Sequence, residues 1–289
     1  MSPARLAFRH ASAFLLALVL MGTAAAQERL GVNLADKPDP VALSAFNVCI
    51  IRDDARLDLE GLHAVGTKVL GTIDLREVSV ASEAAKEAQG LGVPLRESGA
   101  AGVARLDVTH PGWVTVVARV LVRAAAERGF DGFVLTGLGS LAGEAERAAA
   151  LEMLAVLRGM YPEKTLILKD APSLSDEAGR HLDGVFITSG QNVEPRVREA
   201  VRQGLKAYVV ETGTKPEQIQ ERAQAIEALG GVAFFTTPSL DGVNLGPLRE
   251  VTRRIVILHS GKARDSFAAA VLHGSLQWLG YEVLYCEFT

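Results

Sequence analysis

The sequence predicts an α/β fold: a closed (β/α)8 barrel followed by the start of a second α/β domain. Eight short apolar segments recur between residues 31 and 236. Most of these segments are continuously apolar rather than alternating, which is typical of parallel strands that helices cover. Helical patterns fill the spaces between them, and strand–helix alternation repeated in this way closes into a barrel.

Each expected element follows from its local pattern. The expected strands are Gly31–Leu34, Val48–Arg52, Lys68–Ile73, Gly132–Thr136, Thr165–Leu168, Gly184–Thr188, Ala207–Glu211 and Val232–Thr236. The clearest expected helices, with apolar residues on one face, are Val114–Arg128, Gly143–Met160 and Lys215–Leu229. Pro216 and Gly230 are start and stop signals for the last of these. An insert, Ser79–His110, is expected to be a surface excursion with one short extra strand at Arg105–Val108.

Two segments lie outside the barrel, which is expected to span residues 27–252. Arg5 and Arg9 precede a short apolar run, Ala11–Met21, and small residues follow, which is the pattern of a secretory signal over residues 1–26. We expect a periplasmic protein that has no membrane contact after cleavage; an anchored helix is the alternative. Residues 253–289 predict a strand, a helix over Ser266–Leu279 and a second strand. Such a unit needs a parallel sheet to join, so we expect the opening of a truncated second α/β domain.

Composition argues against several classes of function. The formal net charge is −4 and no basic block occurs, so we expect no nucleic-acid partner. The six histidines lack the spacing of a metal-binding pair, and Ser260-Gly-Lys262 lacks the upstream glycine of a phosphate-binding loop. We therefore predict no metal and no cofactor. Cys49 and Cys286 lie in apolar segments and are expected to be buried free thiols.

In barrels of this kind the reactive groups lie at the C-terminal ends of the strands. The polar residues at these positions are Asn33, Asp53, Asp54, Asp74, Glu77, Thr136, Lys169, Asp170, Thr188, Ser189, Glu211, Thr236 and Thr237. Carboxylates and hydroxyls suit sugar hydroxyls, and hydrolysis of a glycosidic bond normally requires two carboxyl groups that face each other across that bond. The predicted substrate-binding residues are Asp53, Asp74, Glu77, Thr136, Lys169, Asp170, Thr188 and Glu211.

The acids of the third and seventh strands also have structural interpretations. Asp74 and Glu77 fit a loop pair that is satisfied by Arg76 or by backbone amides. Glu211 either points into the mouth of the barrel or caps the helix that begins near Pro216, because acids favour helix N-termini.

Three further positions carry similar alternatives. One of Asp53 and Asp54 is expected to cap a helix that starts near Leu57. Lys169 and Asp170 form an internal ion pair or contact a ligand. Asp131 lies at the opposite, N-terminal end of its strand, where a structural role is expected.

Several motifs in order resemble a known family. The most specific run is Leu106–Trp113 followed by Arg128–Phe133. The other matching pieces are Lys37–Phe46, Leu62–Leu70, Tyr161–Pro162, Leu166–Leu168 and His181–Val185. From about residue 30 to residue 253 the chain resembles the barrel of glycoside hydrolase family 114, the endo-α-1,4-polygalactosaminidase group, and within it the amino-terminal hydrolase domain of PelA-type proteins. The resemblance implies a periplasmic domain whose partners are an amino-sugar exopolysaccharide, a downstream domain of the same chain or other exopolysaccharide-export proteins.

The chain departs from the family pattern where the chemistry would occur. Thr136 replaces the aspartate that ends the fourth strand, and Thr188 aligns with the glutamate that ends the sixth. Asn33 replaces a stacking aromatic residue, Lys169–Ala171 replaces an Asn-Arg-Gly stretch, and Glu77 alone remains of a Ser-x-Gly-Glu pattern. A threonine does not ionise near neutral pH, and loss of a catalytic carboxylate forfeits an acid–base contribution of about 10²–10⁴-fold.

These observations leave three hypotheses. The leading one is a pseudo-hydrolase that binds or guides an amino-sugar exopolysaccharide without cutting it. The alternative is an active endo-glycosidase that uses relocated acids, with Glu77, Glu211 and Asp170 as catalytic candidates. In the third, the barrel serves only to position a downstream catalytic domain.

Overall fold

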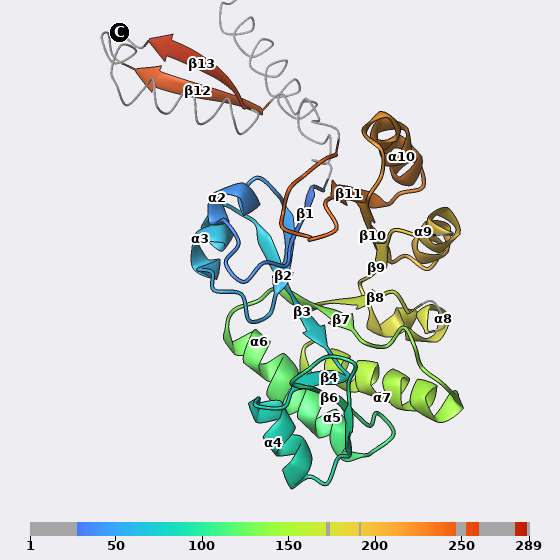
Figure 1. The fold of residues 1–289 in the computed structure, drawn as a ribbon. Coiled ribbons are helices and arrows are strands. Elements are labelled where there is room, and N and C mark those ends of the chain that lie inside the picture. The colour runs from blue at the N-terminus through green and yellow to red at the C-terminus, as the bar shows by residue number, and fades with distance from the viewer. Residues whose placement is uncertain (1–27, 172–173, 191, 247–252, 260–280, 288–289) are drawn as a thin grey trace, which may run out of the picture.

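The computed structural model describes residues 28–171, 174–190, 192–246, 253–259 and 281–287. Eight strands form one sheet in the order β1-β2-β3-β7-β8-β9-β10-β11, and every neighbouring pair is parallel (Figure 1). Their bounds are β1 Leu30–Asn33, β2 Val48–Arg52, β3 Lys68–Asp74, β7 Gly132–Thr136, β8 Thr165–Lys169, β9 Gly184–Thr188, β10 Lys206–Thr212 and β11 Val232–Thr236. The predicted (β/α)8 barrel is confirmed, and each expected strand is found to within one residue at either end.

Contacts between segments distant in sequence bring the first and last strands together. At the C-terminal end of the sheet, the Leu34 amide donates to the Leu240 carbonyl at 2.7 Å, beside an antiparallel bridge between Asn33 and Asp241. At the opposite end, the Tyr208 hydroxyl donates to Glu28 at 2.5 Å. The segment that precedes β1 is therefore joined to β10, and the segment that follows β11 is joined to β1.

Alternation along the strands separates two apolar cores. The interior of the barrel is filled by Leu30, Val32, Val48, Ile50, Leu70, Val134, Ile167, Phe186, Tyr208, Val210 and Phe234. The strand residues between these positions point outward, where they pack against the helices in a second and larger core. Because successive side chains on a strand point to opposite faces, one strand supplies both cores. The same alternation decides which polar side chains reach the mouth of the barrel.

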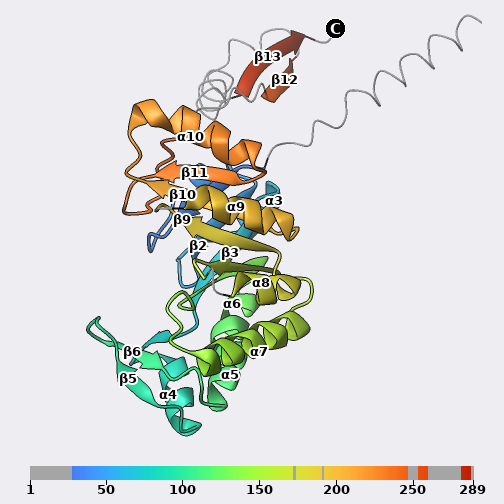
Figure 2. The same cartoon turned by 90° about the vertical axis from the view of Figure 1, so that its right-hand side faces the viewer.

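Helices lie around the outside of the strands (Figures 1 and 2). Their bounds are α2 Pro40–Leu43, α3 Leu59–Ala64, α5 Gly112–Val116, a π-helical segment Val117–Val122, α6 Arg123–Glu127, α7 Glu144–Met160, α8 Ser175–Ala178, a 3-10 turn Gly179–His181, α9 Val193–Arg202 and α10 Pro216–Ala228. The expected helix over Val114–Arg128 is formed by α5, the π-helical segment and α6 in succession. The other two expected helices are α7 and α10, and Pro216 occupies the first turn of α10 as expected.

The insert after β3 contains more regular structure than the sequence predicted. Three short strands, β4 Glu77–Ser79, β5 Leu95–Glu97 and β6 Val103–Leu106, form an antiparallel sheet in the order β4-β6-β5, and α4 Glu83–Gly90 lies beside them. The single extra strand expected at Arg105–Val108 therefore begins two residues earlier and has two partners. Strands of three residues are too short to produce a periodic apolar pattern, which is why β4 and β5 were missed.

Beyond the barrel, β12 Arg253–His259 and β13 Tyr281–Glu287 pair in parallel, as a strand–helix–strand unit requires. The expected helix over Ser266–Leu279 lies outside the described residues, as does the expected signal over residues 1–26. Within the part of the chain that the structure describes, no helix is both long enough and apolar enough to cross a bilayer.

Candidate functional site

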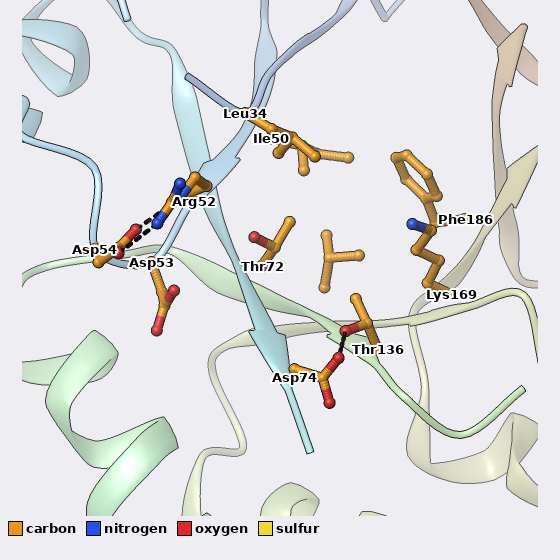
Figure 3. A pocket seen from close by; sticks show the side chains of 11 residues that line it. Leu34, Ile50, Arg52, Asp53, Asp54, Thr72, Asp74, Thr136, Lys169 and Phe186 are labelled. Carbon is orange, nitrogen blue, oxygen red and sulfur yellow. Dashed lines mark hydrogen bonds and ion pairs between the residues drawn. The ribbon is translucent and has the colours of Figure 1, made fainter. Parts of the chain in front are cut away.

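A pocket of about 290 Å³ lies at the C-terminal ends of β2, β3, β7 and β8 (Figure 3). It is lined by Leu34, Ile50, Arg52, Asp53, Asp54, Thr72, Asp74, Val134, Thr136, Lys169 and Phe186. This is the end of the barrel at which enzymes of this architecture hold their reactive groups. Of the residues predicted from the sequence to bind substrate, the structure brings four together here: Asp53, Asp74, Thr136 and Lys169.

Asp74 accepts three hydrogen bonds. Its Oδ1 accepts from the backbone amides of Arg76 at 2.9 Å and Glu77 at 2.8 Å, and its Oδ2 accepts from the Thr136 hydroxyl at 3.1 Å. A Cβ atom on Gly137 would lie 2.6 Å from Asp74 Oδ1, so the chain can pass this close to the carboxylate because a glycine follows Thr136. The hypothesis that backbone amides satisfy Asp74 accounts for the first two hydrogen bonds, and the Thr136 hydroxyl supplies a third.

The second expected acid position forms a similar pair. The Thr188 hydroxyl donates to Asp170 Oδ2 at 2.5 Å, and the Thr188 amide donates to Oδ1 at 3.1 Å. Arg196, on α9, donates to the same Oδ1 at 2.9 Å. The ion pair of Asp170 is therefore with Arg196, and the alternative in which it pairs with Lys169 is wrong. Neither Asp170 nor Thr188 lines the pocket.

The carboxylates of Asp53 and Asp54 lie in different environments. Arg52 binds Asp54 through two hydrogen bonds of 2.7 and 2.6 Å and also contacts Asp36 at 2.6 Å. The Arg52 hydrogen bond lowers the pKa of Asp54, whereas burial, and then the charge of Asp54, raises the pKa of Asp53. Neither residue caps α3: Asp58 does so by accepting from the Glu60 amide at 3.1 Å. The capping expectation is wrong because α3 begins two residues later than Leu57.

The two glutamates proposed as relocated acids point away from the pocket. Glu77 lies on β4 and accepts from Arg105 at 2.9 Å and from Ser98 at 3.0 Å. The hydrogen bond from Arg105 lowers the pKa of Glu77. Glu211 is 5% exposed and binds Arg222 of α10. In β10 the inward positions belong to the residues on either side of Glu211, so its side chain turns toward α10 rather than into the mouth.

Asp131 has structural partners at the opposite end of the barrel. Its Oδ2 accepts from the Val69 amide at 2.7 Å and lies 3.0 Å from His63 Nε2. The carboxylate thus joins the starts of β3 and β7, in agreement with the structural role expected for it. Cys49 is a buried free thiol, as expected, and burial raises its pKa to about 12. The side chain of Cys286 lies outside the described residues.

Three pocket residues near the ends of strands were not predicted from the sequence. Thr72 and Phe186 lie two residues before the predicted positions Asp74 and Thr188 on the same faces of β3 and β9, and Arg52 is the last residue of β2. The missing signal was the alternation within each strand. Among the described residues, no group of three or more histidine, cysteine or acidic side chains is arranged to hold a metal ion.

Comparisons with known proteins agree with this architecture. No protein-family model and no curated protein matches the chain. The structure is similar to the glycoside hydrolase domain of PelA from Pseudomonas aeruginosa, with a TM-score of 0.62 and 19% identity over 75% of this chain and 97% of that one. It is also similar to Ega3 from Aspergillus fumigatus, solved with galactosamine, with a TM-score of 0.56 and 10% identity over 74% and 93% of the two chains. The chain has the barrel fold of these hydrolases.

A third structure extends the likeness to another class of glycosidase. The α-galactosidase TtGalA from Thermus thermophilus matches with a TM-score of 0.50 and 17% identity, over 71% of this chain and 57% of that one. At these identities the likeness concerns the fold, and what this chain does depends on its own residues. In its pocket, those residues offer carboxylates, two threonine hydroxyls, an ammonium and apolar side chains, which is a set suited to binding a sugar.

Proposed function

We propose that this domain binds an amino-sugar polysaccharide at the mouth of its barrel and does not hydrolyse it. The observation that carries the proposal is the pairing of hydroxyls with carboxylates at the two positions where hydrolase acids are expected. Thr136 donates to Asp74, and Thr188 donates to Asp170. The likeness in fold to the hydrolase domain of PelA, and to Ega3 with its galactosamine, supports a sugar of this class.

The contacts of these carboxylates argue against proton transfer to a glycan. Hydrolysis requires one carboxylic acid that gives a proton to the leaving oxygen and a second carboxylate on the other side of the bond. Asp74 already accepts three hydrogen bonds, and Asp170 lies outside the pocket in an ion pair with Arg196. Glu77 and Glu211 are bound to arginines away from the pocket. These four acids are thus placed to bind or to stabilise rather than to exchange protons.

An active endo-glycosidase is the second candidate, and one observation favours it. Asp53 lines the pocket, and burial raises its pKa, which is the direction that suits a general acid. In that case Asp53 would be the proton donor, and Asp74 would be the second carboxylate that lines the pocket.

Binding is tested with the purified chain and a partly de-N-acetylated N-acetylgalactosamine polymer in isothermal titration calorimetry. We expect saturable binding that Asp53→Asn and Asp74→Asn each weaken by about tenfold, since each removes a charge from the pocket. Glu221→Gln, an exposed change of the same kind on α10, should leave binding unchanged. Absence of binding by the unaltered, folded chain would overturn the proposal and leave a purely structural role for the barrel.

We also propose that the chain is exported, because its first 26 residues have the pattern of a secretory signal. Expression of the whole chain in a Gram-negative host should give a periplasmic product that begins at Gln27. Mass spectrometry of the product checks this, and an uncleaved chain held in the inner membrane would contradict it.

A further inference from the structure

The charges that line the pocket are separated across it (Figure 3). Asp53, Asp54 and Asp74 lie on the side of β2 and β3, whereas Lys169 comes from β8 on the other side, next to Phe186. Arg52 adds no free positive charge, because Asp54 and Asp36 bind it. A ligand in this pocket therefore meets a negative side and a positive side.

Lys169 is a cation without a carboxylate partner in the described part of the chain. The neighbouring Asp170 is bound to Arg196 instead. The ammonium of Lys169 lies 5.7 Å from the centroid of the Phe186 ring, which stabilises it without using its hydrogen-bond donors in a conventional bond. Those donors remain available to a ligand, since an ammonium carries three of them.

The wall beside Lys169 is apolar. Val134 of β7 and Phe186 of β9 line the pocket from the two strands that flank β8, and both belong to the core inside the barrel. A donor next to such a wall matches an acetamido group, whose carbonyl oxygen accepts a hydrogen bond and whose methyl group is apolar. A free sugar ammonium at the same point would face a like charge and would lose the apolar contact.

We propose that Lys169 makes this corner of the pocket an acetamido subsite, which selects an N-acetylated over a de-N-acetylated amino sugar. The inference rests on the proposed function and deepens it, because it names the acetylation state that the pocket prefers. Lys169 is then a specificity-determining residue that contacts the ligand.

The test compares N-acetylgalactosamine and galactosamine oligosaccharides of equal length, titrated separately into the chain. The measured quantity is the ratio of the two affinities, because Asp53 and Asp74 attract the ammonium groups of the galactosamine oligosaccharide in the unaltered chain and in each Lys169 variant alike. Lys169→Met should lower the ratio of the acetylated to the galactosamine affinity about tenfold, the scale of one charge contact at a partly exposed site, by weakening the acetylated ligand and strengthening the other. Lys169→Arg, which keeps the charge, should leave the ratio close to that of the unaltered chain.

Lys86→Met is the matched control, because Lys86 lies on α4, away from the pocket, and is largely exposed. It should leave both affinities unchanged, and thermal unfolding checks that each variant is folded. An unchanged ratio in Lys169→Met, or an equal fall of the ratio in Lys169→Arg, would overturn the inference while the proposed function stands. Failure of both oligosaccharides to bind would overturn the proposed function itself.

Discussion

At the scale of single residues, each threonine at an expected acid position donates its hydroxyl proton to a neighbouring aspartate. The hydroxyls of Thr136 and Thr188 donate to Asp74 and Asp170, so Thr136, the one of the two that lines the pocket, can act toward a ligand only as an acceptor. A sugar hydroxyl or ammonium is a suitable donor for such a group. The arrangement favours recognition, because no proton is left at either position to transfer to a leaving oxygen.

Glu211 is expected to contribute stability rather than binding. Glu211→Gln removes the charge of a buried carboxylate whose partner Arg222 is 36% exposed, so the free energy of unfolding should fall by about 1–2 kcal/mol. Glu221→Gln, on the exposed side of α10, should change it by less than about 0.5 kcal/mol. Urea unfolding followed by circular dichroism measures both. If Glu211→Gln kept its stability and lost polysaccharide binding, then Glu211 would face the ligand instead.

The two neighbouring aspartates should give opposite pH dependences. Burial raises the pKa of Asp53, so its contribution to the free energy of unfolding is largest at low pH and falls as the pH rises from the unfolded value through the raised folded one. The Arg52 hydrogen bond lowers the pKa of Asp54, so its contribution is present above the unfolded pKa and is lost as the pH falls through the lowered folded value.

We therefore expect Asp53→Asn to stabilise the chain at neutral pH. Asp54→Asn should destabilise it, by less than about 1 kcal/mol because the pair with Arg52 is largely exposed. Urea unfolding between about pH 4 and pH 7 covers the window in which carboxyl groups titrate. Shifts of the same sign in both variants would show that the environments of the two carboxylates are not as described.

At the scale of elements, the strands were the predictable part. Largely apolar runs such as Val48–Arg52 and Gly132–Thr136 can be recognised as strands from the local sequence alone. The direction in which a residue at the end of a strand points also follows from the alternation of side chains along that strand. Because Tyr208 points into the barrel, the alternation predicts that Glu211, three residues later, points outward. The direction of the Asp170 side chain could not be predicted in this way, because Asp170 lies beyond the end of β8 and its φ is 45°. Its partner Arg196 comes from α9, which is distant in sequence.

The close approach of β7 and β8 depends on Gly132. A Cβ atom there would lie 2.2 Å from the Thr165 carbonyl oxygen, which belongs to the backbone and cannot rotate away. Gly132→Ala should therefore lower the free energy of unfolding by about 2–4 kcal/mol. Gly159→Ala, at an open position in α7, should raise it by about 0.5–1 kcal/mol through helix propensity. Equal effects of the two substitutions in denaturant unfolding would refute this account of the strand packing.

At the scale of the whole molecule, closure of the barrel depends on residues before β1 and after β11. Glu28 accepts a hydrogen bond from Tyr208 and forms an ion pair with Lys206, at the end of the barrel opposite the pocket. Burial is the main reason why the pKa of the Tyr208 hydroxyl is raised, and the hydroxyl therefore stays protonated and donates the hydrogen bond. No local sequence pattern predicts this contact, because Glu28 and Tyr208 are 180 residues apart.

Loss of this contact should weaken the barrel without altering the pocket. Glu28→Gln removes the charge from both interactions and should lower the free energy of unfolding by about 1–2 kcal/mol. Polysaccharide affinity, measured by calorimetry at a temperature where the variant is folded, should stay the same. A large loss of affinity with unchanged stability would contradict the separation of the two ends of the barrel.

The most direct test of the whole account is product analysis. The purified chain is incubated at high concentration with a partly de-N-acetylated N-acetylgalactosamine polymer, and shortened oligosaccharides are sought by mass spectrometry. The account predicts that neither the unaltered chain nor Asp53→Asn releases a shortened product. Oligosaccharides that the unaltered chain releases and Asp53→Asn does not would contradict it, and would establish Asp53 as the acid of an active glycosidase.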